Sequence, residues 1–178
     1  MSDWIYTTNE KNTARFSLGR PGPRMLCCIG VNPSTAHPGK LDQTLTRVSR
    51  FARDKAPYEG WLMLNLYPQR ATNPVNIHRR RQTALHHQNL EEIAALFRAY
   101  PGMDVWAAWG VEIERRPFLW RCLSDIVEAI SEVSGPDVPW IHLGALTKAG
   151  HPRHPLYLPG RAEFSAYDIR GYLANASF

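Results

Sequence analysis

The sequence predicts a three-layer α/β domain, in which helices cover both faces of a central sheet of four parallel strands. Three observations carry this prediction. Four short apolar runs alternate little between apolar and polar residues, which is typical of strands that are buried on both faces. Stretches with helical periodicity separate these runs, and such an order favours a parallel sheet. The chain has 178 residues, of which 44% are hydrophobic and 21% charged, and this suits one globular domain over residues 1–178.

The predicted strands begin with a short N-terminal hairpin over residues 1–20. Strand-like stretches at 4–8 and 14–18 flank the polar turn Asn9-Glu10-Lys11-Asn12. Cys27 and Cys28 fall on the next strand, where neighbouring side chains point to opposite faces, so both are expected to fill the core. The four strands of the sheet are predicted at residues 25–31, 61–66, 105–109 and 140–143.

Helices are predicted between and after these strands. Apolar residues repeat at helical spacing in each stretch, and in the first of them arginines occupy the opposite face. His86 and His87 are adjacent in one predicted helix and are both expected on its surface. The periodic stretches lie at residues 41–51, 90–97, 118–133 and 164–173.

Ligands of a parallel α/β sheet bind at the carboxyl ends of its strands. Polar, glycine and proline residues gather at these points of the sequence, and we therefore expect the site there. The segments are Gly30-Val31-Asn32-Pro33-Ser34-Thr35-Ala36, Asn65-Leu66-Tyr67-Pro68-Gln69-Arg70, Trp109-Gly110 and residues 147–156.

The charge of the chain favours an anionic partner such as nucleic acid. The net charge is +5, and 17 of the 21 basic residues are arginine, which suits bidentate phosphate contacts. A solvated basic surface explains the same charge without a partner. No apolar run is long enough for a membrane helix, and no basic segment followed by an apolar one opens the chain. A cytoplasmic protein without a membrane partner is therefore expected, and a monomer is favoured.

Two common kinds of site are not predicted. Residues 34–41 follow a strand, but Pro38 removes one of the backbone donors that a P-loop uses for phosphate. His151 and His154 are close in sequence, yet Pro152 between them argues against a helix that would align them on a metal ion. We expect neither a metal nor a cofactor.

Asn32 and Asn65 each end a predicted strand. A carboxamide offers donors and an acceptor, so it can bind a nucleobase edge or hold a water molecule. Turn formation by Asn32 before Pro33, and a loop contact by Asn65, explain the same residues without a ligand. The residues alone leave both interpretations open.

Four short motifs stand at the ends of the predicted strands. In their order they resemble the motifs of the uracil-DNA glycosylase superfamily, over about residues 25–175. The first is similar to the Asn version of the catalytic motif in the mismatch-specific and thymine-DNA glycosylase branch. The motifs are Gly30-Val31-Asn32-Pro33, Leu62-Met63-Leu64-Asn65, Ala108-Trp109-Gly110 and His151-Pro152-Arg153-His154-Pro155-Leu156.

A closer resemblance is to a family of uncharacterised bacterial domains with the same fold. Its pattern is Asn-Pro-Ser-Thr-Ala, then Asp-x-Thr-x-x-Arg, then Gly-His-Pro-x-His-Pro-Leu-Tyr. These motifs stand here at residues 32–36, 42–47 and 150–157. The chain is therefore identified as a member of a domain-of-unknown-function family related to uracil-DNA glycosylases, which implies a fold but no established reaction.

The glycosylase resemblance implies a role for each motif residue. Asn32 would position a water, Asn65 would bind the base edge, and His151 or His154 would stabilise the departing base. The other substrate-binding residues would be Gly30, Pro33, Ser34, Tyr67 and Trp109, with Leu156, Tyr157 and Leu158 as the wedge. The phosphate contacts would be Arg47, Arg70, Lys148 and Arg153.

Two departures from the glycosylase pattern change these expectations. Asn32 cannot accept a proton as an aspartate does, so the water would lack a general base. Asp42 is most simply the N-cap of a helix, but it would supply the missing carboxylate if its loop folds over the pocket. Ser34 replaces a bulky aromatic, so the pocket should select less strictly for uracil.

The sequence therefore predicts a nucleobase-recognising protein that hydrolyses an N-glycosidic bond in nucleic acid. The alternative is a non-catalytic module on the same scaffold that binds a nucleotide or nucleic acid. A protein-interaction domain is the third class, and failure to bind any nucleotide would distinguish it.

Overall fold

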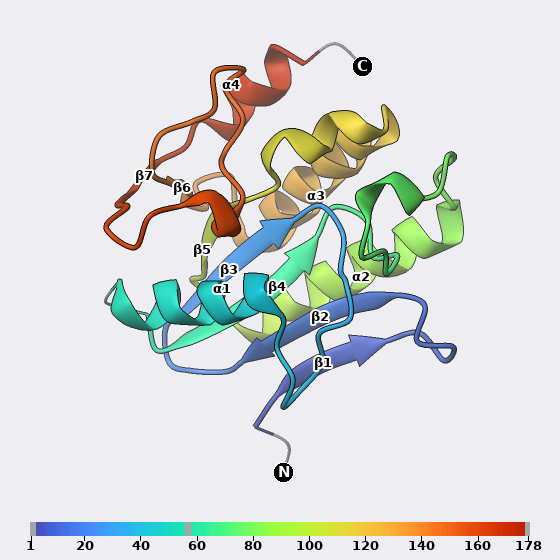
Figure 1. The fold of residues 1–178 in the computed structure, drawn as a ribbon, viewed down its shortest axis with the longest axis horizontal. Coiled ribbons are helices and arrows are strands. Elements are labelled where there is room, and N and C mark those ends of the chain that lie inside the picture. Colours follow the sequence, from blue (N-terminus) through green and yellow to red (C-terminus); the bar gives the residue numbers. More distant parts are fainter. Residues whose placement is uncertain (1–2, 56–57, 177–178) are drawn as a thin grey trace.

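A mixed sheet of seven strands forms the centre of the molecule (Figure 1). The computed structural model describes residues 3–55 and 58–176, so residues 1 and 2 of the predicted hairpin lie outside the described part. The strands are β1 Ile5–Thr8, β2 Arg15–Arg20, β3 Met25–Gly30, β4 Gly60–Asn65, β5 Asp104–Ala107, β6 Trp140–Leu143 and β7 Phe164–Ala166. Their order across the sheet is β1, β2, β4, β3, β5, β6, β7.

The four strands predicted from the apolar runs form the parallel middle of this sheet. β3 pairs in parallel with β4 on one side and with β5 on the other, and β5 pairs in parallel with β6. The chain thus adds β4 on one side of β3 and later adds β5 on the other side. Such a reversal of strand order creates a crevice at the carboxyl ends of the two strands beside it, here β3 and β5.

The whole sheet is wider than predicted and is not purely parallel. The N-terminal hairpin does not stand apart, because β2 pairs antiparallel with β4 and thereby covers the edge of the parallel strands. At the other edge, residues 164–166 pair antiparallel with β6. The predicted helix at 164–173 is therefore wrong in its first part, and α4 begins only at Ile169.

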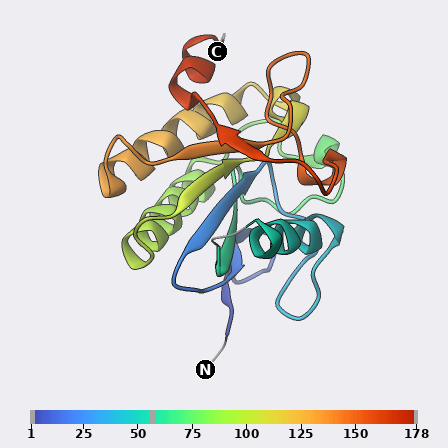
Figure 2. The ribbon, with the colours of Figure 1, turned by 90° about the vertical axis from the view of Figure 1, so that its left-hand side faces the viewer.

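Helices cover both faces of the sheet, as Figure 2 shows. α1 (Gln43–Asp54) lies on one face, whereas α2 (Thr83–Ala99) and α3 (Phe118–Ser134) pack together on the other. α4 (Ile169–Ala174) follows the last strand. Short 3-10 turns lie at η1 Pro74–Asn76, η2 Gly110–Arg115 and η3 Pro155–Tyr157.

The core consists of one apolar layer on each face of the sheet. Cys27 packs with α2 and α3, and Cys28 packs with α1, which confirms that these neighbours point to opposite faces. All three cysteines are buried, and burial raises the pKa of each thiol, that of Cys122 to about 12. The prediction of a surface position for His86 is wrong, because α2 packs this ring against Asp125 of α3 at 2.7 Å.

No helix among the described residues is long and apolar enough to span a membrane.

Candidate functional site

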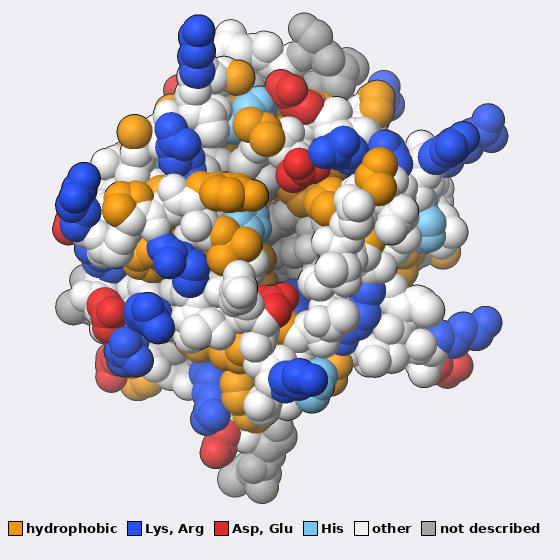
Figure 3. All heavy atoms as spheres, in the orientation of Figure 1, with side chains coloured by type: hydrophobic (Ala, Val, Ile, Leu, Met, Phe, Trp, Pro, Cys, Tyr) orange, Lys and Arg blue, Asp and Glu red, His pale blue; other side chains and the backbone are white. Residues whose placement is uncertain are grey.

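A cavity of about 790 Å³ lies at the carboxyl ends of β3, β4 and β5, in the crevice that the strand order predicts. This face is hollowed near its centre, with acidic side chains at the margin and Lys and Arg mostly farther out (Figure 3). The sequence-predicted site residues that line the cavity are Gly30, Asn32, Pro33, Ser34, Asp42, Asn65, Trp109, Arg153, His154, Leu156 and Tyr157.

Asn65 is the last residue of β4 and is 1% exposed. Neither its Oδ1 nor its Nδ2 has a hydrogen-bond partner among the described residues. Leaving one buried polar group unpaired costs about 1–3 kcal/mol, so this carboxamide is expected to be satisfied from the cavity. Gly30 stands opposite on β3, where a Cβ atom would come within 2.8 Å of the Met63 methyl and 3.5 Å of the Asn65 Oδ1.

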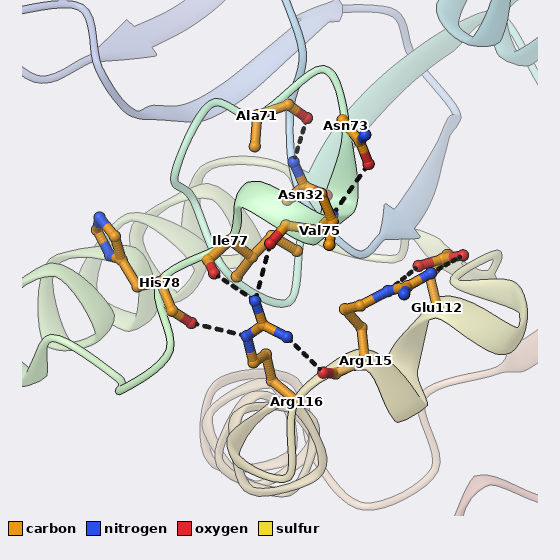
Figure 4. Close-up of polar contacts among 9 residues, drawn as sticks. All are labelled: Asn32, Ala71, Asn73, Val75, Ile77, His78, Glu112, Arg115 and Arg116. Atoms are coloured by element: carbon orange, nitrogen blue, oxygen red, sulfur yellow. Dashed lines mark hydrogen bonds and ion pairs between the residues drawn. The ribbon is translucent and has the colours of Figure 1, made fainter.

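The carboxamide of Asn32 is held by backbone carbonyls. Its Nδ2 donates to the carbonyl of Ala71 at 2.8 Å, a bond visible in Figure 4, and to that of Pro33 at 3.0 Å. With both N–H groups used, its Oδ1 is the atom left to accept a hydrogen bond. The side chain lines the cavity, so it can orient a water or a ligand N–H there.

The structure brings His154, and not His151, to the cavity. The Nδ1 of His154 accepts from the Leu156 N–H at 3.2 Å, so the proton of the neutral ring lies on Nε2. Burial lowers the pKa of His154, and the charges of Asp42 and Glu112 offset only part of this effect. At neutral pH His154 is therefore an uncharged hydrogen-bond donor.

His151 does not line the cavity, and its side chain is 3% exposed. Its Nδ1 contacts the Tyr172 hydroxyl at 2.8 Å, and its Nε2 contacts the Glu114 carboxylate at 2.9 Å. Both ring nitrogens are thus used within the protein. The loop is placed by Gly110, whose φ of +61° suits glycine and whose N–H donates to the carbonyl of Pro152 at 2.9 Å.

Two carboxylates line the cavity near His154. Asp42 caps α1, as predicted, through a 2.8 Å bond from the Leu45 N–H to its Oδ1, and it also lines the cavity. Glu112 is held at both oxygens by Arg115, at 2.9 and 3.0 Å (Figure 4). Both oxygens of Glu112 are therefore in contact with Arg115, whereas the hydrogen bond that caps α1 uses only one oxygen of Asp42.

Besides His151, five residues predicted for the site do not line this cavity: Tyr67, Arg47, Arg70, Lys148 and Leu158, the last of which is buried. Tyr67 is buried in the apolar layer that α2 and α3 form with the sheet, and its hydroxyl contacts the His78 ring at 2.8 Å. Arg47 donates to the carbonyls of Pro155 and Leu158, and Arg70 donates to the carbonyls of Ser34 and Ala36. These two arginines therefore hold loops that form the site, and Lys148 is exposed on a nearby loop.

Another arginine, Arg116, holds the segment around η1, which forms one wall of the cavity. The guanidinium of Arg116 donates to three backbone carbonyls of this segment, those of Val75, Ile77 and His78, at 2.9 to 3.1 Å (Figure 4). Pro74 of the same segment lines the cavity. An arginine at the end of η2 thus fixes a loop that comes from a distant part of the sequence.

Sequence reasoning missed Arg15 and Glu112, which both line the cavity. The available signal for Glu112 was its position directly after the third strand, at Trp109-Gly110. The available signal for Arg15 was its charge, because it stands between the apolar residues of a strand-like stretch.

No group of three or more His, Cys, Asp or Glu side chains suited to a metal ion occurs in the described part of the chain.

Comparison with known proteins identifies the family. A family model described as a protein of unknown function, DUF1643, matches residues 15–156. The chain belongs to the DUF1643 family. The matched segment of this DUF1643 protein contains every residue that lines the cavity except Tyr157. No curated protein and no solved structure matches the chain. The prediction of an uncharacterised domain family is confirmed, and the relation to uracil-DNA glycosylases stays a prediction.

Proposed function

We propose that this DUF1643 protein binds a nucleobase in the cavity and hydrolyses an N-glycosidic bond in nucleic acid. The observation that carries the proposal is the carboxamide of Asn65, which is buried, lines the cavity and has no hydrogen-bond partner in the described part of the chain. A base edge offers the paired donor and acceptor groups that a carboxamide matches. The strand order β4, β3, β5, β6 supports the proposal, because the four glycosylase-like motifs then all lie at the carboxyl ends of neighbouring parallel strands.

The chemistry follows from the placement of three side chains. The oxygen of a water held by Asn32 Oδ1 forms the new bond to the sugar carbon while the C–N bond breaks. The electron pair of that bond leaves with the base, and the Nε2–H of His154 stabilises the resulting negative charge by a hydrogen bond. The attacking water gives its proton to Asp42 or to solvent, so that the products are a sugar hydroxyl and the free base.

The rim of the cavity supports nucleic acid as the carrier of the base. Tyr157 is 76% exposed and Leu156 is 37% exposed, and both line the cavity. Exposed aromatic and aliphatic side chains can occupy the gap that a flipped nucleotide leaves in the stack. Lys and Arg side chains spread over the same face favour a phosphate backbone (Figure 3).

The proposal is tested by base release. Labelled single- and double-stranded oligonucleotides that carry uracil, hypoxanthine, xanthine or a mismatched thymine are incubated with wild type and with Asn32→Ala. We expect release of one of these bases by the wild type and a loss of about 100-fold or more in the variant. Equal release by both proteins, or release by neither, would contradict the proposal.

A binding module without turnover is the second candidate, and two observations favour it. The residue at the first motif, Asn32, is an amide that cannot take a proton, and both oxygens of Glu112 accept hydrogen bonds from Arg115. Oligonucleotide binding that weakens with salt, without release of any base, would select this function.

A further inference from the structure

Arg15 is an unusual member of the cavity lining. Its side chain is only 2% exposed, although it carries a full positive charge. Its Nη1 donates to the carbonyl of Ala36 at 3.2 Å, and its Nε has no hydrogen-bond partner among the described residues. Neither the proposed reaction nor the motifs described above give this side chain a role.

An irregularity in the N-terminal hairpin places Arg15 at the cavity. Thr7 pairs with Ser17, but the next residue, Thr8, pairs with Arg15, so Phe16 is an extra residue on β2. Such bulges change the direction of the side chains beside them and occur often next to functional sites. β2 is also the neighbour of β4, the strand that ends in Asn65. Two buried polar side chains therefore line one cavity from neighbouring strands, and each has at least one polar atom without a hydrogen-bond partner among the described residues.

Arg15 is close enough to Asp42 to interact with its charge, but it forms no direct ion pair with a described carboxylate. No ion pair within 4.0 Å involves Arg15 among the described residues. Instead Arg70 donates to the same Ala36 carbonyl at 3.2 Å, which brings a second positive charge close. Burial and Arg70 lower the pKa of Arg15 to about 10, against the charge of Asp42, so the guanidinium stays charged at neutral pH. A buried charge of this kind is stabilised by an opposite charge that enters the cavity.

We propose that Arg15 makes the cavity a binding site for a negatively charged, planar nitrogen heterocycle. Asn65 would bind the edge of the ring through its donor and acceptor atoms, and Arg15 would supply charge-assisted donors to its anionic oxygen. In the reaction proposed above, such a ring is the base anion that leaves with the electron pair of the broken C–N bond. The inference rests on the proposed function and adds to it a charge preference of the base pocket.

The test compares two rings of the same size at neutral pH. Barbiturate is an anion under these conditions, whereas uracil is neutral. Their affinities for the full chain are measured by calorimetric titration with wild type, Arg15→Gln and Arg98→Gln. Arg98 is an exposed residue near the end of α2, so its variant has the same net charge as Arg15→Gln without a change in the cavity. Circular dichroism and thermal melting check that each variant folds.

We expect barbiturate to bind wild type and Arg98→Gln at least about tenfold more tightly than uracil. Arg15→Gln should lose this preference while its affinity for uracil stays within about threefold of wild type. Equal affinity of wild type for the two rings overturns the inference by itself, even where Arg15→Gln does not fold. A preference that persists in folded Arg15→Gln overturns it as well.

Two further outcomes separate this inference from the proposed function. If uracil binds and barbiturate binds no more tightly than uracil, the proposed base pocket stands and only its preference for an anion fails. If neither ring binds, both the inference and the base pocket fail. Inorganic phosphate is the third probe, and displacement of barbiturate by phosphate without any binding of uracil would assign the charge of Arg15 to a phosphate group and overturn the inference.

Discussion

His151 and His154 lie close in sequence, but their surroundings differ. We expect His154→Asn to lower base release by about 100-fold, because the variant loses the Nε2–H donor. An Asn at this position can still accept from the Leu156 N–H, so the free energy of unfolding should change by less than about 1 kcal/mol. Base release and urea unfolding measure the two effects.

His151→Ala is the matched comparison for this prediction. It removes a buried ring with two polar contacts, so it should lower the free energy of unfolding by about 2–4 kcal/mol. Where the variant is folded, base release should stay near the wild-type rate. The opposite result, with activity lost in His151→Ala and kept in His154→Asn, would exchange the assignments.

For residues at strand ends, a place in the site could be predicted from the sequence, because the carboxyl ends of the parallel strands meet at the cavity. Asn32 and Asn65 are such residues, and both line the cavity. Asp42 also lines it, but it was predicted as the N-cap of a helix and not from a strand end. Arg15 could not be predicted in this way, because its position depends on a bulge and on the pairing of β2 with a strand far along the chain. Arg47 was assigned to phosphate from its charge, whereas the structure uses that charge on backbone carbonyls.

At the level of elements, the four parallel strands were predictable because helices on both faces require apolar runs without alternation. β7 was not, because its three residues are mostly exposed and only pairing with β6 distinguishes them from a helix start. The hairpin was predicted as an element, but its place at the sheet edge depends on an unpaired edge of β4 that no local pattern reveals.

The segment η1 gives a prediction about one element. Arg116→Ala removes three hydrogen bonds to the carbonyls of residues 75, 77 and 78, and we expect it to lower the free energy of unfolding by about 2 kcal/mol. Amide hydrogen exchange should become faster in residues 73–78, because this loop is then less tightly held. Urea unfolding and exchange measured by mass spectrometry provide the two values.

The neighbouring Arg115 is the control for this prediction. Its contacts are to the side chain of Glu112, and surface ion pairs of this kind add little to stability. Arg115→Ala should therefore leave exchange in residues 73–78 unchanged. Equal exchange rates in Arg116→Ala and wild type would show that other contacts hold the segment.

The whole molecule should lose stability in mild acid. Burial lowers the pKa of His78, His86 and His154 in the folded state, with Asp125 partly opposing the effect at His86. Below their unfolded pKa of about 6.5, the unfolded chain binds protons more readily than the folded chain. The stability contributed by these rings is present above about pH 6.5 and is lost as the pH falls through their folded pKa values.

Unfolding by urea at pH 7.5, 6.5 and 5.5 measures this dependence, and we expect the free energy of unfolding to fall between the last two. Most carboxylates are still ionised at pH 5.5, so their protonation accounts for little of the change. His86→Gln should have a smaller loss over this interval than wild type. A free energy of unfolding that is constant from pH 7.5 to 5.5 would contradict the prediction.

The burial of all three cysteines has a practical consequence for work on ligands. A thiol reacts as the thiolate, and these three are both covered by the fold and held in the protonated form. A cysteine placed by Tyr157→Cys at the exposed rim of the cavity would therefore be the single reactive thiol of the folded protein. A fluorescent dye attached there would report the arrival of an oligonucleotide or a free base, without any native cysteine having to be removed first.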